Sequence, residues 1–570
     1  MKTARWLALL VALVLLASAC DTGGSLDTGA TKPGRGVKRG TLRVFNYSDV
    51  EALDPGIAYY APDWALLRGL VRELYSFDSR AEGESSLQPV PDLADGPYKL
   101  SDDGRTYTFR IRRGVLYDLP GRRDVRAEDF IYAVERQFDK RNPSPNPYSR
   151  LITGVDDFAA GKARTISGMK ALDRHTLRIT LDQPASDFPS ILTLPFFSPV
   201  PEEFARKYTP GLDYAQHLIS SGPYRLKQYT PGRRIELVRN ENWDPRTDPL
   251  RAAWVDMITV SIGISEAGIQ KAIETGEADL NLDAIPPPVG DLQRLSGDAA
   301  LSRQLAIETT GCVHYLTMQM DVDPTRKLAV RQAVNYAIDR QAAVLAIGGR
   351  FAGEPASTIL SPTLAGYSAF NLYPSQDNAG DPDKAKQLLA GAGFRDGVDL
   401  TYVGQSSPRW KSLYEALRVS LARAGIRLKP TFYKGNDVYK KSLRLASRRE
   451  QHQLGAARWC PDVPGNGSRS FIGVLLDGRD LSPTATNNFG HYNNPKVNSL
   501  IDEAYKTRDD RARTVLWGQI DRLLMEDAAW APLVYDREAF FWSSRVRNWT
   551  FSPWLSNPDI TNLWLDPNSP

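Results

Sequence analysis

Two side chains in this sequence have the spacing of a covalent catalyst, Ser167 and Lys170. They form the pattern S-x-x-K, in which a lysine amine takes the proton of a serine hydroxyl and the serine attacks a carbonyl carbon. The companion patterns S-D-N and K-T-G of penicillin-recognising enzymes occur nowhere in the chain. A serine hydrolase of the cell envelope using Ser167 and Lys170 is thus one alternative, but the sequence favours a protein that is not an enzyme.

The sequence patterns that bind metals and nucleotides are incomplete. The chain has no H-E-x-x-H or C-x-x-C motif, and its five histidines are scattered: His175, His217, His314, His452 and His491. Gly161-Lys162 is followed by Ala163, which lacks the hydroxyl that a P-loop offers to magnesium. We therefore expect no cofactor and no direct metal site.

Composition and charge narrow the class of protein. Hydrophobic residues make up 42% and charged residues 24% of the 570 residues, which is typical of globular proteins. A net charge of +4 provides no field that would recruit nucleic acid, so no nucleic-acid partner is expected. Three cysteines are too few for a disulfide scaffold or a multi-cysteine metal cluster.

The first twenty residues indicate the compartment. Lys2 and Arg5 precede an uncharged run over 6–19 that is shorter than the roughly 20 residues of a membrane-spanning helix. The run ends in small residues before Cys20, which resembles the lipobox of bacterial lipoproteins. We expect a signal peptide at 1–19, lipidation of Cys20 and a flexible tether at 20–40. The protein would then be anchored at the extracytoplasmic face of a membrane, periplasmic or at the cell surface; the alternative is a plain leader with Cys20 incidental.

The sequence after residue 40 predicts both strands and helices. Apolar and polar residues alternate over 107–112 and over 177–181, which predicts two half-buried strands. Apolar residues at helical spacing predict helices over 381–391, 413–425 and 494–504, where proline pairs or glycines mark the ends. The body is therefore expected to be a mixed α/β structure.

Nine sequence blocks, in order along the chain, resemble those of one family. They read PDLA at 91–94, SDDGRTYTFRIR at 101–112, VRAEDF at 125–130, SGPY at 221–224, RNENW at 239–243, GEAD at 276–279, VRQAVNYAIDR at 330–340, YNNP at 492–495 and APLV at 531–534. The family is that of the extracellular solute-binding proteins of peptide- and nickel-type ABC importers, family 5. The resemblance covers essentially 40–570.

The resemblance implies an α/β, two-lobed periplasmic-binding-protein-like fold with a hinge, of the large peptide-binding class. Lobe I would comprise 41–72, 220–307 and 531–570, and it would carry an accessory domain at 73–219. Lobe II would be 308–530, with crossings near Thr309 and Ala531. Such lobes close on a solute and remove it from water.

A candidate ligand-binding site is indicated by the stretch Arg458-Trp459-Cys460-Pro461-Asp462. In oligopeptide-binding relatives a Trp-Cys-x-Asp stretch supplies the carboxylate that holds the α-ammonium group of the peptide, and Asp462 stands at that position. Trp459 would form a pocket wall. The alternatives are a solvated loop aspartate and a core tryptophan. The resemblance adds four candidate ligand-binding residues: Arg458, Tyr59, Tyr60 and Thr310.

The resemblance also implies a disulfide between Cys312 and Cys460, since some oligopeptide-binding relatives bridge these two places. Two separate buried thiols are the alternative. The expected function is that of a monomeric binding protein that delivers a short peptide to an ABC permease and its ATPase subunits. A nickel or other metal chelate, another non-peptide solute, and a signalling role remain as alternatives.

Overall fold

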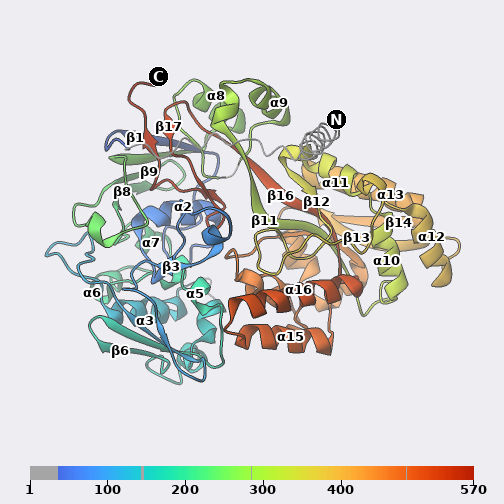
Figure 1. Cartoon of the computed structure of the whole chain (residues 1–570), viewed down its shortest axis with the longest axis horizontal. Helices are drawn as coiled ribbons and strands as arrows, with labels where there is room; N and C mark the ends of the chain where they lie inside the picture. Colours follow the sequence, from blue (N-terminus) through green and yellow to red (C-terminus); the bar gives the residue numbers. More distant parts are fainter. Residues whose placement is uncertain (1–35, 143–146, 284, 483, 570) are drawn as a thin grey trace, which may run out of the picture.

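The chain folds into two bodies joined by two long strands (Figure 1). The computed structural model describes residues 36–142, 147–283, 285–482 and 484–569. The expected signal peptide and Cys20 lie outside the described residues. No helix in the described ranges is both long and apolar enough to cross a membrane.

The first body is built around a four-stranded sheet of order β1-β10-β9-β8. β1 (Thr41–Asn46) runs parallel to β10 (Met257–Ile262), and β9 (Arg234–Arg239) pairs antiparallel with β10 and with β8 (Tyr224–Thr230). The pairing joins segments that are distant in sequence, so the chain leaves this sheet after β1 and returns to it at β8. The main helices beside it are α2 (Ala61–Leu70), α8 (Glu266–Glu274) and α9 (Val289–Gly297).

The excursion between β1 and β8 contains the region expected as an accessory domain, with a sheet of order β4-β5-β7-β6. Its strands are β4 (Lys99–Leu100), β5 (Thr106–Arg110), β7 (Thr176–Thr180) and β6 (Met169–Asp173). β5 and β7 confirm the two strands predicted from alternation, because Phe109 and Leu177 are fully buried while their neighbours are not. The helices of this region are α3 (Ala127–Glu135), α4 (Val155–Ala159), α5 (Phe188–Ile191), α6 (Glu202–Ala205) and α7 (Leu212–Ala215).

The second body holds a six-stranded sheet of order β12-β16-β11-β15-β13-β14. Its strands are β11 (Leu305–Met318), β12 (Gly353–Pro355), β13 (Val398–Gln405), β14 (Ile426–Tyr433), β15 (Leu454–Trp459) and β16 (Trp530–Phe541). Its helices are α10 (Leu328–Ala337), α11 (Arg340–Ile347), α12 (Pro382–Gly391), α13 (Pro408–Arg423), α14 (Ile472–Leu476), α15 (Pro495–Lys506) and α16 (Asp510–Glu526).

The three predicted helices correspond to α12, α13 and α15. The side chains of Asp381 and Asn494 accept hydrogen bonds from the first-turn backbone of α12 and α15, as expected for residues that precede a helix-starting proline. α13 begins earlier than predicted, at Pro408, because Trp410 extends its buried face by one turn.

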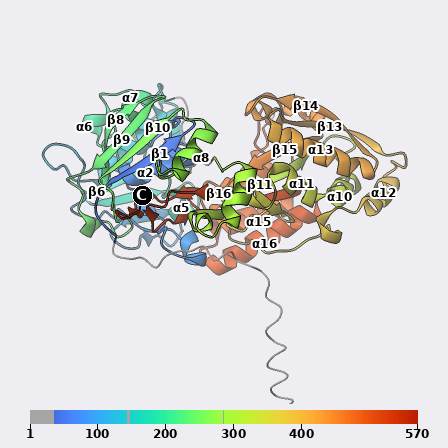
Figure 2. The same ribbon diagram turned by 90° about the horizontal axis from the view of Figure 1, so that it is seen from above.

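β11 and β16 belong to both bodies and run between them (Figure 2). They pair antiparallel, with a break in register between Thr309 and Val313, where Gly311 has a φ of +83°. Val313 and Tyr535 lie in the core of the second body, whereas Phe541 lies in a small cluster beside the first. The lobe boundaries, with crossings near Thr309 and Ala531, remain a prediction.

Candidate functional site

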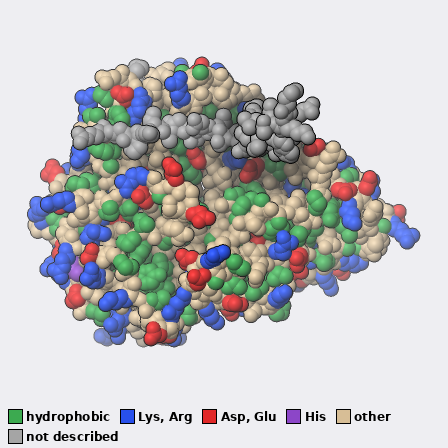
Figure 3. Space-filling model, in the orientation of Figure 1, with side chains coloured by type: hydrophobic (Ala, Val, Ile, Leu, Met, Phe, Trp, Pro, Cys, Tyr) green, Lys and Arg blue, Asp and Glu red, His purple; other side chains and the backbone are tan. Residues whose placement is uncertain are grey.

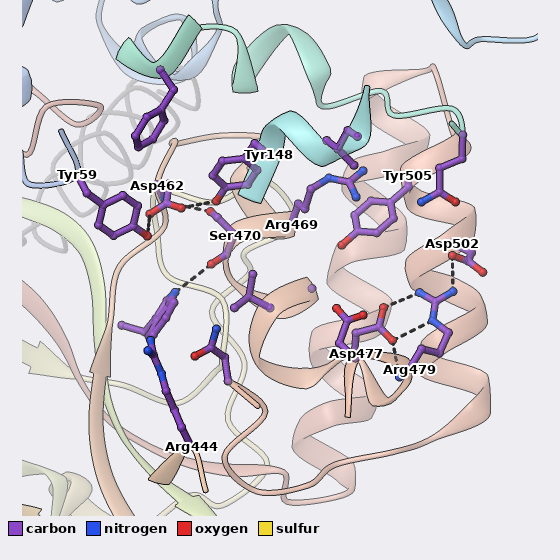
Figure 4. Close-up of a pocket in the computed structure, with 18 of the residues that line it drawn as sticks. Tyr59, Tyr148, Arg444, Asp462, Arg469, Ser470, Asp477, Arg479, Asp502 and Tyr505 are labelled. Carbon is purple, nitrogen blue, oxygen red and sulfur yellow. Dashed lines mark hydrogen bonds and ion pairs between the residues drawn. The ribbon is translucent and has the colours of Figure 1, made fainter. Parts of the chain in front are cut away.

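A cavity of about 750 Å³ opens where the two bodies meet (Figure 4). The first body contributes Ile57, Tyr59, Tyr148, Leu151, Gln183 and Phe196 to its wall, and the second contributes Arg444, Trp459, Asp462, Arg469, Ser470, Asp477, Arg479, Asp480, Asp502 and Tyr505 among others. The lining thus combines aromatic rings with groups of both charges, which suits a polar solute with an apolar part.

Asp462 lies at one end of this cavity, just beyond β15. Its carboxylate accepts a hydrogen bond from the Tyr59 hydroxyl at 2.9 Å and another from the Tyr148 hydroxyl. The Asp462 backbone N–H donates to Ser470 Oγ at 3.0 Å, which fixes the loop that carries the carboxylate. Burial raises the pKa of Asp462 to about 6, although the two hydroxyl donors partly offset it.

Both tyrosines next to Asp462 remain neutral donors. Burial and the neighbouring carboxylate raise the pKa of Tyr59 and of Tyr148 well above the ordinary value. The Tyr59 ring is held by edge contacts with Tyr60 and Trp64 at 6.1 and 6.3 Å between ring centroids. Two neutral donors leave the negative charge of Asp462 uncompensated, so the carboxylate is suited to a cation that enters the cavity.

Trp459 lies in the cavity wall. Its indole N–H donates to the Ser470 carbonyl at 2.9 Å, so the same residue orients Trp459 and the Asp462 loop. Between the two, Cys460 is bonded to Cys312 of β11 by a disulfide. The disulfide therefore ties the cavity-lining loop to one of the two strands that connect the bodies.

Three candidate residues do not line the cavity. Arg458 precedes Trp459 on β15 and points to the opposite face of the strand, where its guanidinium contacts Asp536 and lies 3.5 Å from Glu538. Tyr60 is half exposed and supports Tyr59 through its ring. Thr310 is buried, with its hydroxyl 3.4 Å from the backbone N–H of Cys312.

The far part of the cavity holds paired charges. The Arg479 guanidinium forms ion pairs with the carboxylates of Asp477 and Asp502, and these residues are drawn at the right of Figure 4. The Arg469 guanidinium forms a bidentate ion pair with the Asp187 carboxylate, with N···O distances of 2.6 and 2.9 Å. Its central carbon lies 3.6 Å from the centroid of the Tyr505 ring.

Several contacts around the cavity join the two bodies. Tyr59, Tyr148 and Asp187 come from the first body, and their partners Asp462 and Arg469 come from the second. Residues of both bodies therefore line the cavity and contact each other beside it.

Sequence reasoning missed Tyr148 and Arg444. Tyr148 follows the sequence NPSPNP at 142–147, and no local pattern connects it with a residue more than 300 positions away. Arg444 lines the cavity, and its Nε has no hydrogen-bond partner among the described residues. Neither carries a spacing signal, because Tyr148 comes from the other body and Arg444 reaches the cavity only through the folding of the second body.

Comparison with known proteins gives a consistent result. The family model for bacterial extracellular solute-binding proteins, family 5 (middle) matches residues 88–476. Heme-binding protein A of Haemophilus influenzae is 27% identical, with 95% of this chain and 96% of the relative covered. The periplasmic oligopeptide-binding protein OppA of Salmonella typhimurium is 26% identical, with 97% and 96% covered. The solved structure of clavulanic acid biosynthesis oligopeptide binding protein 2 is 32% identical, covers 94% of this chain and 96% of its own, and has a TM-score of 0.87.

Proposed function

Because the chain belongs to the family 5 bacterial extracellular solute-binding proteins, we propose that it captures a short peptide between its two lobes for an ABC importer. The permease and its ATPase subunits would receive the peptide when the lobes open. The protein itself performs no catalysis in this proposal, and it acts as a monomer held at the membrane by a lipid on Cys20.

The observation that carries the peptide proposal is the environment of Asp462. The side-chain partners of this buried carboxylate are two neutral hydroxyls, which do not compensate its negative charge. The α-ammonium group of a peptide supplies the missing cation and up to three donors. A charge-assisted hydrogen bond in such surroundings is strong, and a ligand without the cation leaves the carboxylate unpaired.

Three of the candidate residues keep a ligand-related role in this proposal. Asp462 holds the ammonium group, Tyr59 orients Asp462, and Trp459 forms an apolar wall against the first side chain of the peptide. Arg458 acts on the hinge instead of the ligand.

A specific observation keeps a non-peptide solute as the second candidate. One relative that matches nearly the whole chain is named a heme-binding protein. A metal chelate or other non-peptide ligand without an ammonium group would use the aromatic wall and not need the charge of Asp462.

Titration calorimetry with a pool of free tripeptides tests the proposal. Asp462→Asn keeps the side-chain volume and one acceptor oxygen for a tyrosine hydroxyl but removes the charge, so affinity should fall by about 100-fold or more, at about 1.4 kcal/mol per tenfold. Asp480→Asn is the matched control, because it removes a carboxylate from the same cavity away from Tyr59 and Tyr148. Equal losses in the two variants, or no binding of any free peptide by the unaltered protein, would reject the peptide proposal.

A further inference from the structure

The accessory sheet has one apolar face and one cationic face. Its inner face carries buried apolar side chains such as Phe109 and Leu177. On its outer face four residues stand in one row across the strands, each paired in register with the next: Lys99 on β4, Thr108 on β5, Arg178 on β7 and Lys170 on β6. Lysine and arginine side chains are numerous over this region, at the lower left of Figure 3.

Lys170 and Arg178 are directly opposite each other on neighbouring antiparallel strands. Like charges in that position destabilise a sheet unless something neutralises them. Elsewhere on this domain Arg174 pairs with Asp124 at 2.9 Å, whereas no carboxylate among the described residues lies within ion-pair distance of Lys170 or Arg178. In the described part of the chain, the pair therefore has no carboxylate partner.

A pocket of about 230 Å³ lies beside this pair, lined by Thr106, Thr153, Ser167, Gly168, Lys170, Arg178 and Thr180. Three backbone hydrogen bonds close its floor into a ring: Thr153 N–H donates to the Thr180 carbonyl, Thr180 N–H to that of Gly168, and Gly168 N–H to that of Thr153, at 2.7–3.0 Å. A Cβ on Gly168 would lie 2.6 Å from the Thr153 carbonyl oxygen, so this floor needs glycine there.

The pocket walls offer hydroxyl groups and no carboxylate. The Thr153 hydroxyl is buried and has no hydrogen-bond partner among the described residues. The Thr106 and Thr180 hydroxyls lie 3.2 Å apart and share one hydrogen bond, so one of their two protons is left to donate elsewhere. An unsatisfied buried hydroxyl is costly, and a bound acceptor would remove that cost.

We propose that this pocket binds a tetrahedral oxyanion of the phosphate class. Lys170 and Arg178 supply two positive charges, and the hydroxyls of Thr153 and Ser167 donate hydrogen bonds to the oxygens. The site is separate from the cavity around Asp462. It also gives Ser167 and Lys170, the pair that resembled a nucleophile and its base, a shared binding role.

Titration of the mature chain with inorganic phosphate at constant ionic strength, with chloride as reference, tests the site. Phosphate should raise the melting temperature and chloride should not. The double variant Lys170→Gln/Arg178→Gln should weaken phosphate binding at least tenfold, and Ser167→Ala should weaken it a few-fold. Lys99→Gln and Lys162→Gln are controls, one in the same row and one on the same domain, and each should change binding less than twofold. Unchanged peptide binding in the double variant shows that it is folded.

A vesicle experiment distinguishes the two sources of such a group, a free anion and a lipid headgroup. The Cys20→Ser chain is sedimented with phosphatidylcholine vesicles with or without phosphatidylglycerol. Association that requires phosphatidylglycerol and is lost in the double variant identifies a lipid phosphate, and phosphate binding without association identifies a free anion. Two results together would overturn the proposal. The first is phosphate binding that is no stronger than chloride binding, or that is the same in the double variant and in the controls. The second is the absence of vesicle association that depends on phosphatidylglycerol.

Discussion

Two carboxylates lie close to the strands that join the lobes, and their partners differ. Asp536 on β16 lies 3.0 Å from His314 Nε2 and contacts the Arg458 guanidinium, and these two neighbours hold its pKa well below the usual range. Asp462 is bonded to two tyrosine hydroxyls, and its pKa is raised to about 6. The two carboxylates lie on opposite sides of β15, because Arg458 on this strand faces Asp536 and the adjacent Trp459 faces the cavity that contains Asp462.

The comparison supports the proposal that Asp536 has a structural role and that Asp462 binds the ligand. A buried carboxylate with cationic partners already has its charge compensated, and it stabilises the fold in which those partners are placed. A buried carboxylate with neutral partners is destabilised until a cation arrives. In the proposed function, the same type of side chain therefore stabilises the hinge in one place and binds the ligand in the other.

The disulfide between Cys312 and Cys460 is expected to have the largest effect on stability, because it fixes the position of both sites. It closes a loop with a sequence separation of 148 residues. Cys312→Ser with Cys460→Ser should lower the free energy of unfolding by about 2–4 kcal/mol, measured by denaturant unfolding. A loss below about 0.5 kcal/mol would show that the bridge does not constrain these strands.

Asp536→Asn should lower stability and Asp462→Asn should not. Removing the Asp536 charge takes away one of the two carboxylates next to Arg458 and leaves only Glu538, at 3.5 Å. With Arg458 one-third exposed we expect a loss of about 2 kcal/mol. Since its pKa is depressed, this contribution is present at neutral pH and disappears as the pH falls below the ordinary aspartate range. Asp462→Asn should leave the melting temperature unchanged or raise it, because it removes an uncompensated buried charge. Equal destabilisation by both substitutions would contradict the comparison.

The pH dependence of peptide affinity should be modest and specific to Asp462. Binding of an ammonium group requires the ionised carboxylate, which takes up a proton as the pH falls through about 6. Affinity should therefore be highest above pH 7 and about tenfold weaker at pH 5. The Asp462→Asn variant should show a flat profile over this range; a steep profile in that variant would assign the dependence to another group.

The sequence predicted more of the fold than of the site. Strands β5 and β7 and helices α12 and α15 were predictable, because their apolar periodicity and caps are local signals. Asp462 was proposed from the family resemblance, and no local sequence pattern indicated that the Tyr148 hydroxyl would donate a hydrogen bond to it. The direction of Arg458 could not be predicted either, because it depends on which face of β15 meets Asp536 and which meets the cavity.

A thermodynamic cycle that combines the Asp462→Asn substitution with N-acetylation of one peptide tests the central claim most directly. Calorimetry gives the affinity of the unaltered protein and of the variant for the free and for the acetylated peptide. If Asp462 holds the α-ammonium group, each single change should weaken binding by about 100-fold or more, and the second change should add little, because both delete the same interaction. Losses below about tenfold that simply add would contradict the account and favour a non-peptide solute.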